Sequence, residues 1–218
     1  MKRKKKNKKT KVVIPEYMNL MNDKLQGLLK GYGLKVIGGS LAALYEDAFP
    51  DLRDIAMSTI INETRQGHEV WHTAYMSLPT GVKNGNLDRR VLVTLKTKIE
   101  SDEESDGFSN LLKKIVTEFE VNELAIMGIC VFGKMSSVGK LKMLEADDKM
   151  VDSTPGMRKA FFVMHETPEV SSLYIAGRVD DEVSLFEKFP GDYRDNRFMH
   201  IINKNPAPVP EEPESSCN

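Results

Sequence analysis

Apolar residues recur at helical spacing in several segments of the chain, and most of these segments lie in its first third. The broadest stripe belongs to residues 107–120, where Asp106 or Ser109 can cap the helix. The predicted helices cover residues 18–29, 41–48, 51–63 and 107–120. We expect the first of them to lie on the protein's own core; the alternative is a helix that lies on a membrane or a partner.

Strand patterns dominate from residue 69 onward. Residues 90–99 alternate apolar and polar side chains, as in a half-buried strand, and an acidic loop is expected over residues 100–106. Further strands are predicted over residues 34–37, 124–132, 140–145, 159–164, 172–179 and 198–202. Because the helices come early and the strands late, the sequence predicts a single α+β domain over residues 18–204, with helices packed on a mostly antiparallel sheet.

The two ends of the chain differ from this body. Residues 1–17 are predicted to be a disordered arm whose last part, residues 12–17, is extended or a turn because of Pro15. Residues 205–218 are predicted to be a disordered, acidic, proline-rich tail. The arm holds eight cations: Lys2, Arg3, Lys4, Lys5, Lys6, Lys8, Lys9 and Lys11. The net charge of -1 therefore leaves -9 on residues 12–218, so the sequence predicts a basic arm on an acidic body.

A cluster of eight like charges points to an anionic partner. On an acidic membrane each Lys or Arg contributes about 1 kcal/mol, which is enough for salt-sensitive peripheral attachment. On nucleic acid the same cluster would bind phosphates without reading sequence. A nuclear-import receptor could also bind it, or the cluster could merely keep the protein soluble. Self-association would strengthen any of these contacts, because several arms would then engage together.

Composition sets the broad class. The chain has 218 residues, of which 40% are hydrophobic and 29% charged, as expected for one globular domain with flexible ends. Because it shows neither an apolar run of about 20 residues nor a secretory signal, we expect neither a membrane span nor export. Two cysteines, Cys130 and Cys217, fit a reducing compartment such as cytosol or nucleus.

The sequence His68-Glu69-Val70-Trp71-His72 satisfies the H-E-x-x-H pattern of zinc hydrolases. On a helix both imidazoles could reach one zinc ion while Glu69 polarises the attacking water. A third ligand is missing at the expected spacings, and on a strand the two histidines would lie about 13 Å apart. We expect two ordinary histidines, no metal or other cofactor and no enzyme activity; a small zinc hydrolase stays as an alternative.

Other chemical patterns are weaker. Neither a dinucleotide-binding nor a phosphate-binding glycine loop is present, and Cys130 has no predicted base beside it. A secondary basic group is expected to be a solvated face rather than a binding patch. Its members are Lys83, Arg89, Arg90, Lys96 and Lys98.

The organisation of the chain resembles that of the matrix proteins of rhabdoviruses. The likeness rests on the basic cluster, on Pro15-Glu16-Tyr17 directly after it, and on a strand over 34–37 followed by helices over 41–63. It extends to Trp71-His72 and Tyr75-Met76, which lead to a turn at Gly81-Val82-Lys83. The chain departs from the family in having one proline where the budding motif P-P-x-Y has two, in its acidic body, and in its acidic proline tail.

The resemblance implies a non-enzymatic viral matrix protein, a structural constituent of the virion. Its arm would bind acidic phospholipid at the cytoplasmic face of the host membrane, and its body would self-associate and link the nucleocapsid to the envelope during budding. Pro15, Glu16 and Tyr17 would form a late-domain-like motif for a host WW-domain protein, and an import receptor could carry the protein from cytoplasm to nucleus. The alternative is an accessory protein that binds nucleic acid or the nucleocapsid and carries a nuclear import signal.

Overall fold

The computed structural model describes residues 16–32, 34–84, 87–134, 141–144, 158–179, 182–188 and 198–202. Its helices are α1 (Glu16–Gly31), the 3-10 turn η1 (Glu46–Ala48), α2 (Leu52–Arg65) and α3 (Asp102–Phe119). Its strands are β1 (Val36–Tyr45), β2 (His72–Asn84), β3 (Leu87–Thr97), β4 (Glu123–Lys134), β5 (Leu141–Leu144), β6 (Arg158–Glu166), β7 (Ser171–Val179), β8 (Glu182–Val183) and β9 (Glu187–Lys188). Most of the predicted arm and all of the predicted tail lie outside these residues.

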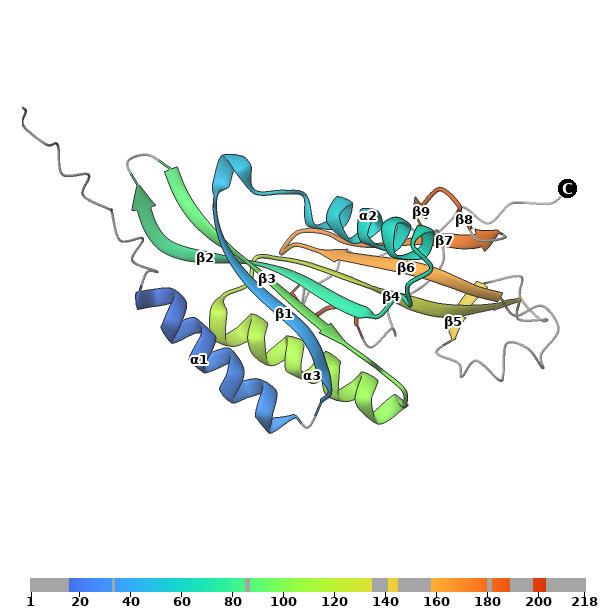
Figure 1. The fold of residues 1–218 in the computed structure, drawn as a ribbon, viewed down its shortest axis with the longest axis horizontal. Helices are drawn as coiled ribbons and strands as arrows, with labels where there is room; N and C mark the ends of the chain where they lie inside the picture. Colours follow the sequence, from blue (N-terminus) through green and yellow to red (C-terminus); the bar gives the residue numbers. More distant parts are fainter. Residues whose placement is uncertain are drawn as a thin grey trace, which may run out of the picture.

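The strands form one sheet in the order β1-β3-β2-β4-β6-β7-β8, with β5 beside β4 and β9 beside β7. All of these neighbours pair antiparallel. Helices α1 and α3 cover one face of the sheet and α2 lies on the other, so the sheet is the middle layer (Figure 1). The predicted α+β class with a mostly antiparallel sheet is confirmed.

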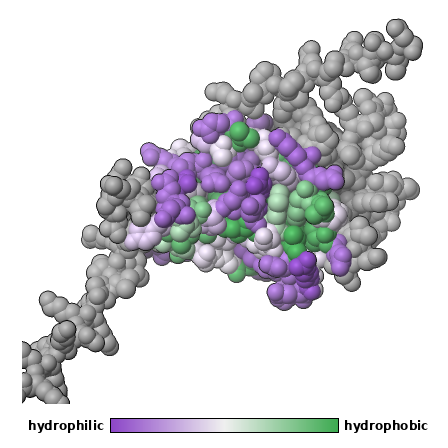
Figure 2. Space-filling model, turned by 90° about the horizontal axis from the view of Figure 1, so that it is seen from above, coloured by the Kyte–Doolittle hydropathy of each residue, from purple (hydrophilic) through white to green (hydrophobic). Residues whose placement is uncertain are grey.

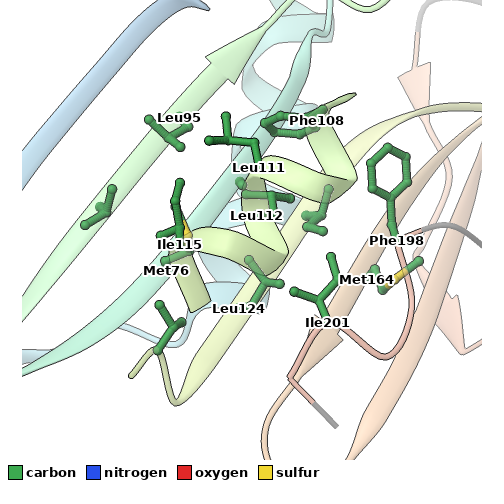
Figure 3. Packing of buried hydrophobic residues seen from close by; sticks show 14 of the residues in the cluster. Met76, Leu95, Phe108, Leu111, Leu112, Ile115, Leu124, Met164, Phe198 and Ile201 are labelled. Atoms are coloured by element: carbon green, nitrogen blue, oxygen red, sulfur yellow. The ribbon is translucent and has the colours of Figure 1, made fainter. Parts of the chain in front are cut away.

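The larger hydrophobic core lies between the sheet and α3. The apolar stripe of α3 supplies Phe108, Leu111, Leu112 and Ile115, all fully buried. They pack with side chains of the sheet and of residues 198–202, as Figure 3 shows for Met76, Leu95, Leu124, Met164, Phe198 and Ile201. Each such side chain contributes about 1.5–3 kcal/mol when it leaves water, so this face contributes most to holding the fold.

The smaller core lies under α2 on the opposite face. Leu52, Ala56 and Ile60 are fully buried there and recur at helical spacing, as expected for this segment. They meet a row of sheet residues: Tyr75, Ala125, Met127, Phe161 and Val163. Asp51 caps α2 by accepting the backbone N–H of Asp54 at 3.1 Å. Both faces of the central strands are therefore buried, which accounts for the nearly continuous apolar run of β4.

The prediction of a helix over residues 41–48 is wrong. Residues 41–45 continue β1, which pairs with β3 from Val36 to Tyr45, and Glu46–Ala48 form the 3-10 turn η1. The strand was expected to end at Gly38 and Gly39, but it passes through both with an irregularity between Val36 and Gly38. Pairing with β3 outweighs the helix propensity of Leu and Ala. One feature of the resemblance, a helical segment beginning at residue 41, is therefore absent.

Helix α3 starts earlier than predicted, at Asp102, within the segment expected to be an acidic loop. Ser101, not Asp106 or Ser109, is the cap: its hydroxyl accepts the backbone N–H of Glu104 at 3.2 Å. The Glu104 carboxylate in turn accepts the N–H of Glu100 at 2.5 Å. This resembles a capping box, and the acidic residues of the first turn stabilise the positive end of the helix dipole.

Three further predictions need correction. Glu16 and Tyr17 belong to the first turn of α1 rather than to an extended segment. The expected turn at Gly81-Val82-Lys83 lies within β2, whose register with β3 shifts between Pro79 and Lys83. Residues 198–202 form a turn and bends instead of a strand, because their backbone N–H groups bind a buried carboxylate described below.

Candidate membrane and assembly surface

Helix α1 is the part of the described chain that follows the basic arm. Met21 and Leu25 are buried, and Leu28 and Leu29 pack half-buried against the larger core. Helix α1 therefore lies on the protein's own core, as expected. The arm cations and Pro15 lie outside the described residues, whereas Glu16 and Tyr17 open the helix.

A groove of about 540 Å³ runs between α1 and β1. Leu25 and Leu29 line it from the helix, and Val36 and Leu41 line it from the strand. Polar side chains, among them Gln26 and Lys30, stand at its margin. The groove therefore presents both apolar and polar side chains between α1 and β1.

Strand β1 forms one end of the sheet (Figure 1). Its 10 residues, Val-Ile-Gly-Gly-Ser-Leu-Ala-Ala-Leu-Tyr, include neither a charged residue nor a proline. One side of the strand pairs with β3; among the described residues, no strand pairs with the other side. An uncharged edge strand of this length presents backbone N–H and C=O groups that can pair with another strand.

The face that carries α2 is largely hydrophilic, with a hydrophobic patch among the polar residues (Figure 2). At the start of α2, Arg53 forms ion pairs with Asp51 and Asp54, both at 3.1 Å. Its guanidinium also lies 5.7 Å from the centre of the Tyr174 ring. Arg53 is therefore engaged by the body's own acids, and an anionic surface gains little from it.

The H-E-x-x-H residues lie between α2 and β2, where residues 68–71 are outside any helix. His68 is exposed, and its Nδ1 is 3.5 Å from a Glu63 carboxylate oxygen. His72 starts β2. The helical arrangement that would stack both imidazoles over one zinc ion is therefore not formed, and no group of three His, Cys, Asp or Glu within the described ranges could hold a metal ion.

His72 instead belongs to an aromatic part of the core. Its ring lies 6.0 Å from that of Phe162 and 6.2 Å from that of Phe198, measured between centres. Gly128 makes room for this ring, because an added Cβ would lie 2.6 Å from His72 Cδ2. Burial lowers the pKa of His72 to about 4, so the imidazole is neutral near pH 7 and serves packing.

Sequence reasoning missed a highly connected polar group of the described body, Glu166. The carboxylate of Glu166, buried at the end of β6, accepts backbone N–H groups of His200 at 2.6 Å and of Ile201 and Ile202 at 2.9 Å. Ser171 Oγ–H adds a bond of 3.3 Å. This clip fastens residues 198–202 over the larger core, directly before the predicted tail. An isolated Glu in a strand pattern gives no sequence signal for such a role.

The secondary basic group does not form a binding patch among its described side chains. Arg90 donates to Asn122 Oδ1 at 2.5 Å and lies over the Phe49 ring. Lys96 pairs with Glu63 at 3.5 Å, and Lys98 pairs with Glu100 at 2.5 Å. The side chains of Lys83 and Arg89 lie outside the described part. Arg90, Lys96 and Lys98 therefore have partners within the body.

Cys130 is an inert core residue. Its thiol donates weakly to the carbonyl oxygen of Ala160 at 3.5 Å. Burial strongly raises the pKa of Cys130, so the nucleophilic thiolate is suppressed.

The chain was compared with models of known protein families, with curated proteins and with solved structures, and none of them matches. No helix in the described ranges is both long and apolar enough to span a bilayer.

Proposed function

We propose that the protein is a non-enzymatic, matrix-like assembly protein. Its arm, Lys2 to Lys11, binds acidic membrane; its body self-associates and links a nucleocapsid to the envelope during budding. The observation that carries the proposal is the division of charge, with eight cations in the first 11 residues and a net charge of -9 on the rest.

This division assigns the two tasks to different parts of the chain. At about 1 kcal/mol for each cation, the arm alone supplies enough attraction to an anionic bilayer. The acidic body is repelled by the same surface, and its described cations Arg53, Arg90, Lys96 and Lys98 are paired with acids or aromatic rings. Attachment should therefore depend on the arm and fall steeply as salt screens it.

The body suits an assembly role rather than catalysis. His68 lies exposed beside Glu63, His72 packs in the core, and Cys130 is buried with a raised pKa. The uncharged edge of β1 offers a means of self-association. Association multiplies weak arm contacts, because each further arm engages at high effective concentration.

Flotation with phosphatidylcholine vesicles, with and without 30 mol% phosphatidylserine (roughly the anionic content of a cytoplasmic leaflet), tests the proposal. The variant replaces all eight arm cations by Gln in the full-length chain. The matched control keeps residues 2–11 but permutes their order, so that charge is conserved and any sequence signal is lost. We expect the wild-type and permuted chains to float with anionic vesicles at low salt, and the Gln variant to stay at the bottom.

Retained flotation of the Gln variant would refute the arm's role, as would equal binding to neutral vesicles. Nucleic acid is tested in parallel with a fluorescent single-stranded oligonucleotide and nuclease-treated protein. If the oligonucleotide displaces the protein from vesicles at equal phosphate concentration, the arm prefers nucleic acid and the alternative of a nucleic-acid-binding accessory protein replaces the membrane proposal.

A further inference from the structure

We propose that β1 pairs antiparallel with β1 of a second copy, joining two sheets into one continuous sheet. The inference deepens the proposed function, since it rests on the proposed self-association and names the strand that performs it. Strand β1 has 10 residues without a charge or a proline, and within the described chain it has a partner strand on one side.

Apart from the irregularity between Val36 and Gly38, the edge lacks the devices that normally prevent such pairing. Natural edge strands carry lysines, prolines or inward charges, or are very short. Strand β1 has none of these, and the side chains of Ser40 and Ala43, on opposite faces of the strand, are small and exposed. Ile37 is exposed at 42% although it is large and apolar. A second strand beside β1 would satisfy the backbone and remove Ile37 from water.

Symmetry restricts the register. In a continuous sheet of two identical antiparallel strands, the twofold axis is normal to the sheet, so each residue faces the same side in both copies. Side chains alternate between the two faces along a strand, so two residues that lie opposite each other and face the same side are an even number of positions apart in the sequence. The twofold axis therefore passes beside one residue, not between two. Centring on Leu41 overlaps nearly the whole strand and places the two Leu41 side chains together beside the groove that they line.

Charges at the two ends of β1 complement this register. Lys35 precedes the strand, while Glu46 and Asp47 follow it, and all three are exposed. Antiparallel pairing around Leu41 brings Lys35 of each copy to Glu46 and Asp47 of the other, at both ends of the interface. A parallel arrangement would instead place like charges together. The occupant that fits the edge best is therefore a second copy of this chain.

Sedimentation of the full-length protein tests the pairing in solution, without membrane or nucleic acid. We expect a concentration-dependent dimer, and about tenfold weaker association for Lys35→Glu and for the double variant Glu46→Lys/Asp47→Lys. Combining all three substitutions in one chain restores opposite charges and should restore the dimer. Ser58→Lys, a charge change at an exposed position of α2, is the matched control and should dimerise as wild type.

Cross-linking tests the register, in a background in which Cys217 is Ser. Directly opposed residues of antiparallel strands have Cα atoms about 4.5–5.5 Å apart, which suits a disulfide. Leu41→Cys should therefore give an oxidised dimer, whereas Ala43→Cys, whose two copies would lie about 13 Å apart, should not.

Any of three results would overturn the inference. The first is a wild-type chain that stays monomeric at about 100 μM, a concentration that corresponds to a binding free energy of roughly -5.5 kcal/mol. The others are charge-reversed variants that dimerise as wild type, and equal cross-linking of Leu41→Cys and Ala43→Cys. If they appear while the flotation result stands, the proposed function survives without this interface. If flotation fails while the dimer forms, the proposed function fails and the interface stands.

Discussion

The two edges of the sheet differ in whether further strands pair with them. At the β7 edge, two short strands add to the outer side: Arg178 and Val179 pair with β8, and Tyr174 and Ile175 pair with β9. Ser184 fixes the segment between them, since its hydroxyl accepts the N–H of Gly177 at 2.8 Å. At the β1 edge, described residues supply no such cover.

Charge follows the same division. The covering strands β8 and β9 have the sequences Glu-Val and Glu-Lys, so ionic side chains occupy the rim on that side. Strand β1 is apolar or small throughout. The β7 side also carries the Glu166 clip, at the end of the neighbouring strand β6. One side of the sheet is therefore closed by later strands of the chain, while the other has no strand beside it within the described ranges.

The largest loss of stability is expected from removing the Glu166 carboxylate on the β7 side. Glu166→Ala removes the acceptor of three buried or part-buried backbone N–H groups, so we expect a loss of about 4 kcal/mol in the free energy of unfolding. Urea denaturation measures this loss, and amide exchange of residues 200–202 should rise most. Glu169→Ala, at an exposed position of the turn before β7, is the control and should cost about 0.5 kcal/mol. If Glu166→Ala lowered the free energy of unfolding no more than Glu169→Ala does, the clip would not stabilise the fold.

Acid should weaken the middle of the sheet through His72. Its folded pKa of about 4 lies below the unfolded value of about 6.5, so the unfolded chain binds a proton first as the pH falls. Stability from this group is complete above about pH 6.5 and declines toward pH 4, by up to about 3 kcal/mol. Unfolding free energies at pH 7 and pH 4.5 measure the decline.

His68, the other histidine of the H-E-x-x-H pattern, supplies the control for this pH dependence. His72→Gln should flatten the slope between pH 7 and pH 4.5, whereas His68→Gln, which changes an exposed side chain, should preserve it. A slope that survives in the His72 variant would assign the acid sensitivity to another group.

Overpacking the middle of the sheet should have an intermediate effect. The Cβ of Gly128→Ala would lie 2.6 Å from His72 Cδ2 and 2.8 Å from Phe162 Cε1. Two rings must then shift within a dense core, and we expect a loss of about 2 kcal/mol. Thermal unfolding measures it; a variant as stable as wild type would mean that the rings relax freely.

The smallest effect should come from the β1 side and have the opposite sign. Gly27 lies inside α1, and an added Cβ would meet nothing within 4 Å. Gly27→Ala should therefore stabilise the protein by up to about 1 kcal/mol through helix propensity. Urea denaturation measures the gain, and amide exchange should slow in α1 but not in β7. Slowing at both edges would mean that the two sides are coupled.

The sequence predicted the elements whose periodicity is strong. Residues 51–63, 90–99, 124–132, 159–164 and 172–179 lie in α2, β3, β4, β6 and β7, with ends displaced by a few residues. The segment 41–48 was misassigned because Leu and Ala suit either structure, and the choice depended on pairing with a strand that comes about 50 residues later. Pattern alone carries no information on that contact.

The candidate site was less accessible to prediction than the fold. The basic arm is visible from composition alone, and its role stays a prediction. The β1 edge could not be seen, because edge position depends on the strand order of the whole sheet. The pattern at His68 and His72 indicates a metal site only if residues 68–72 are helical. Gly67, with a φ of 70°, follows the end of α2 and takes the chain out of the helical conformation before His68.

The cover on β7 also limits how far edge pairing can proceed. A dimer formed through β1 has covered strands at both outer ends, so it closes at two copies and cannot grow into a filament by the same contact. Its twofold axis, normal to the sheet, keeps the α1 helices of both copies on one face. The two arms would then start from the same side of a bivalent unit, and could engage one membrane together.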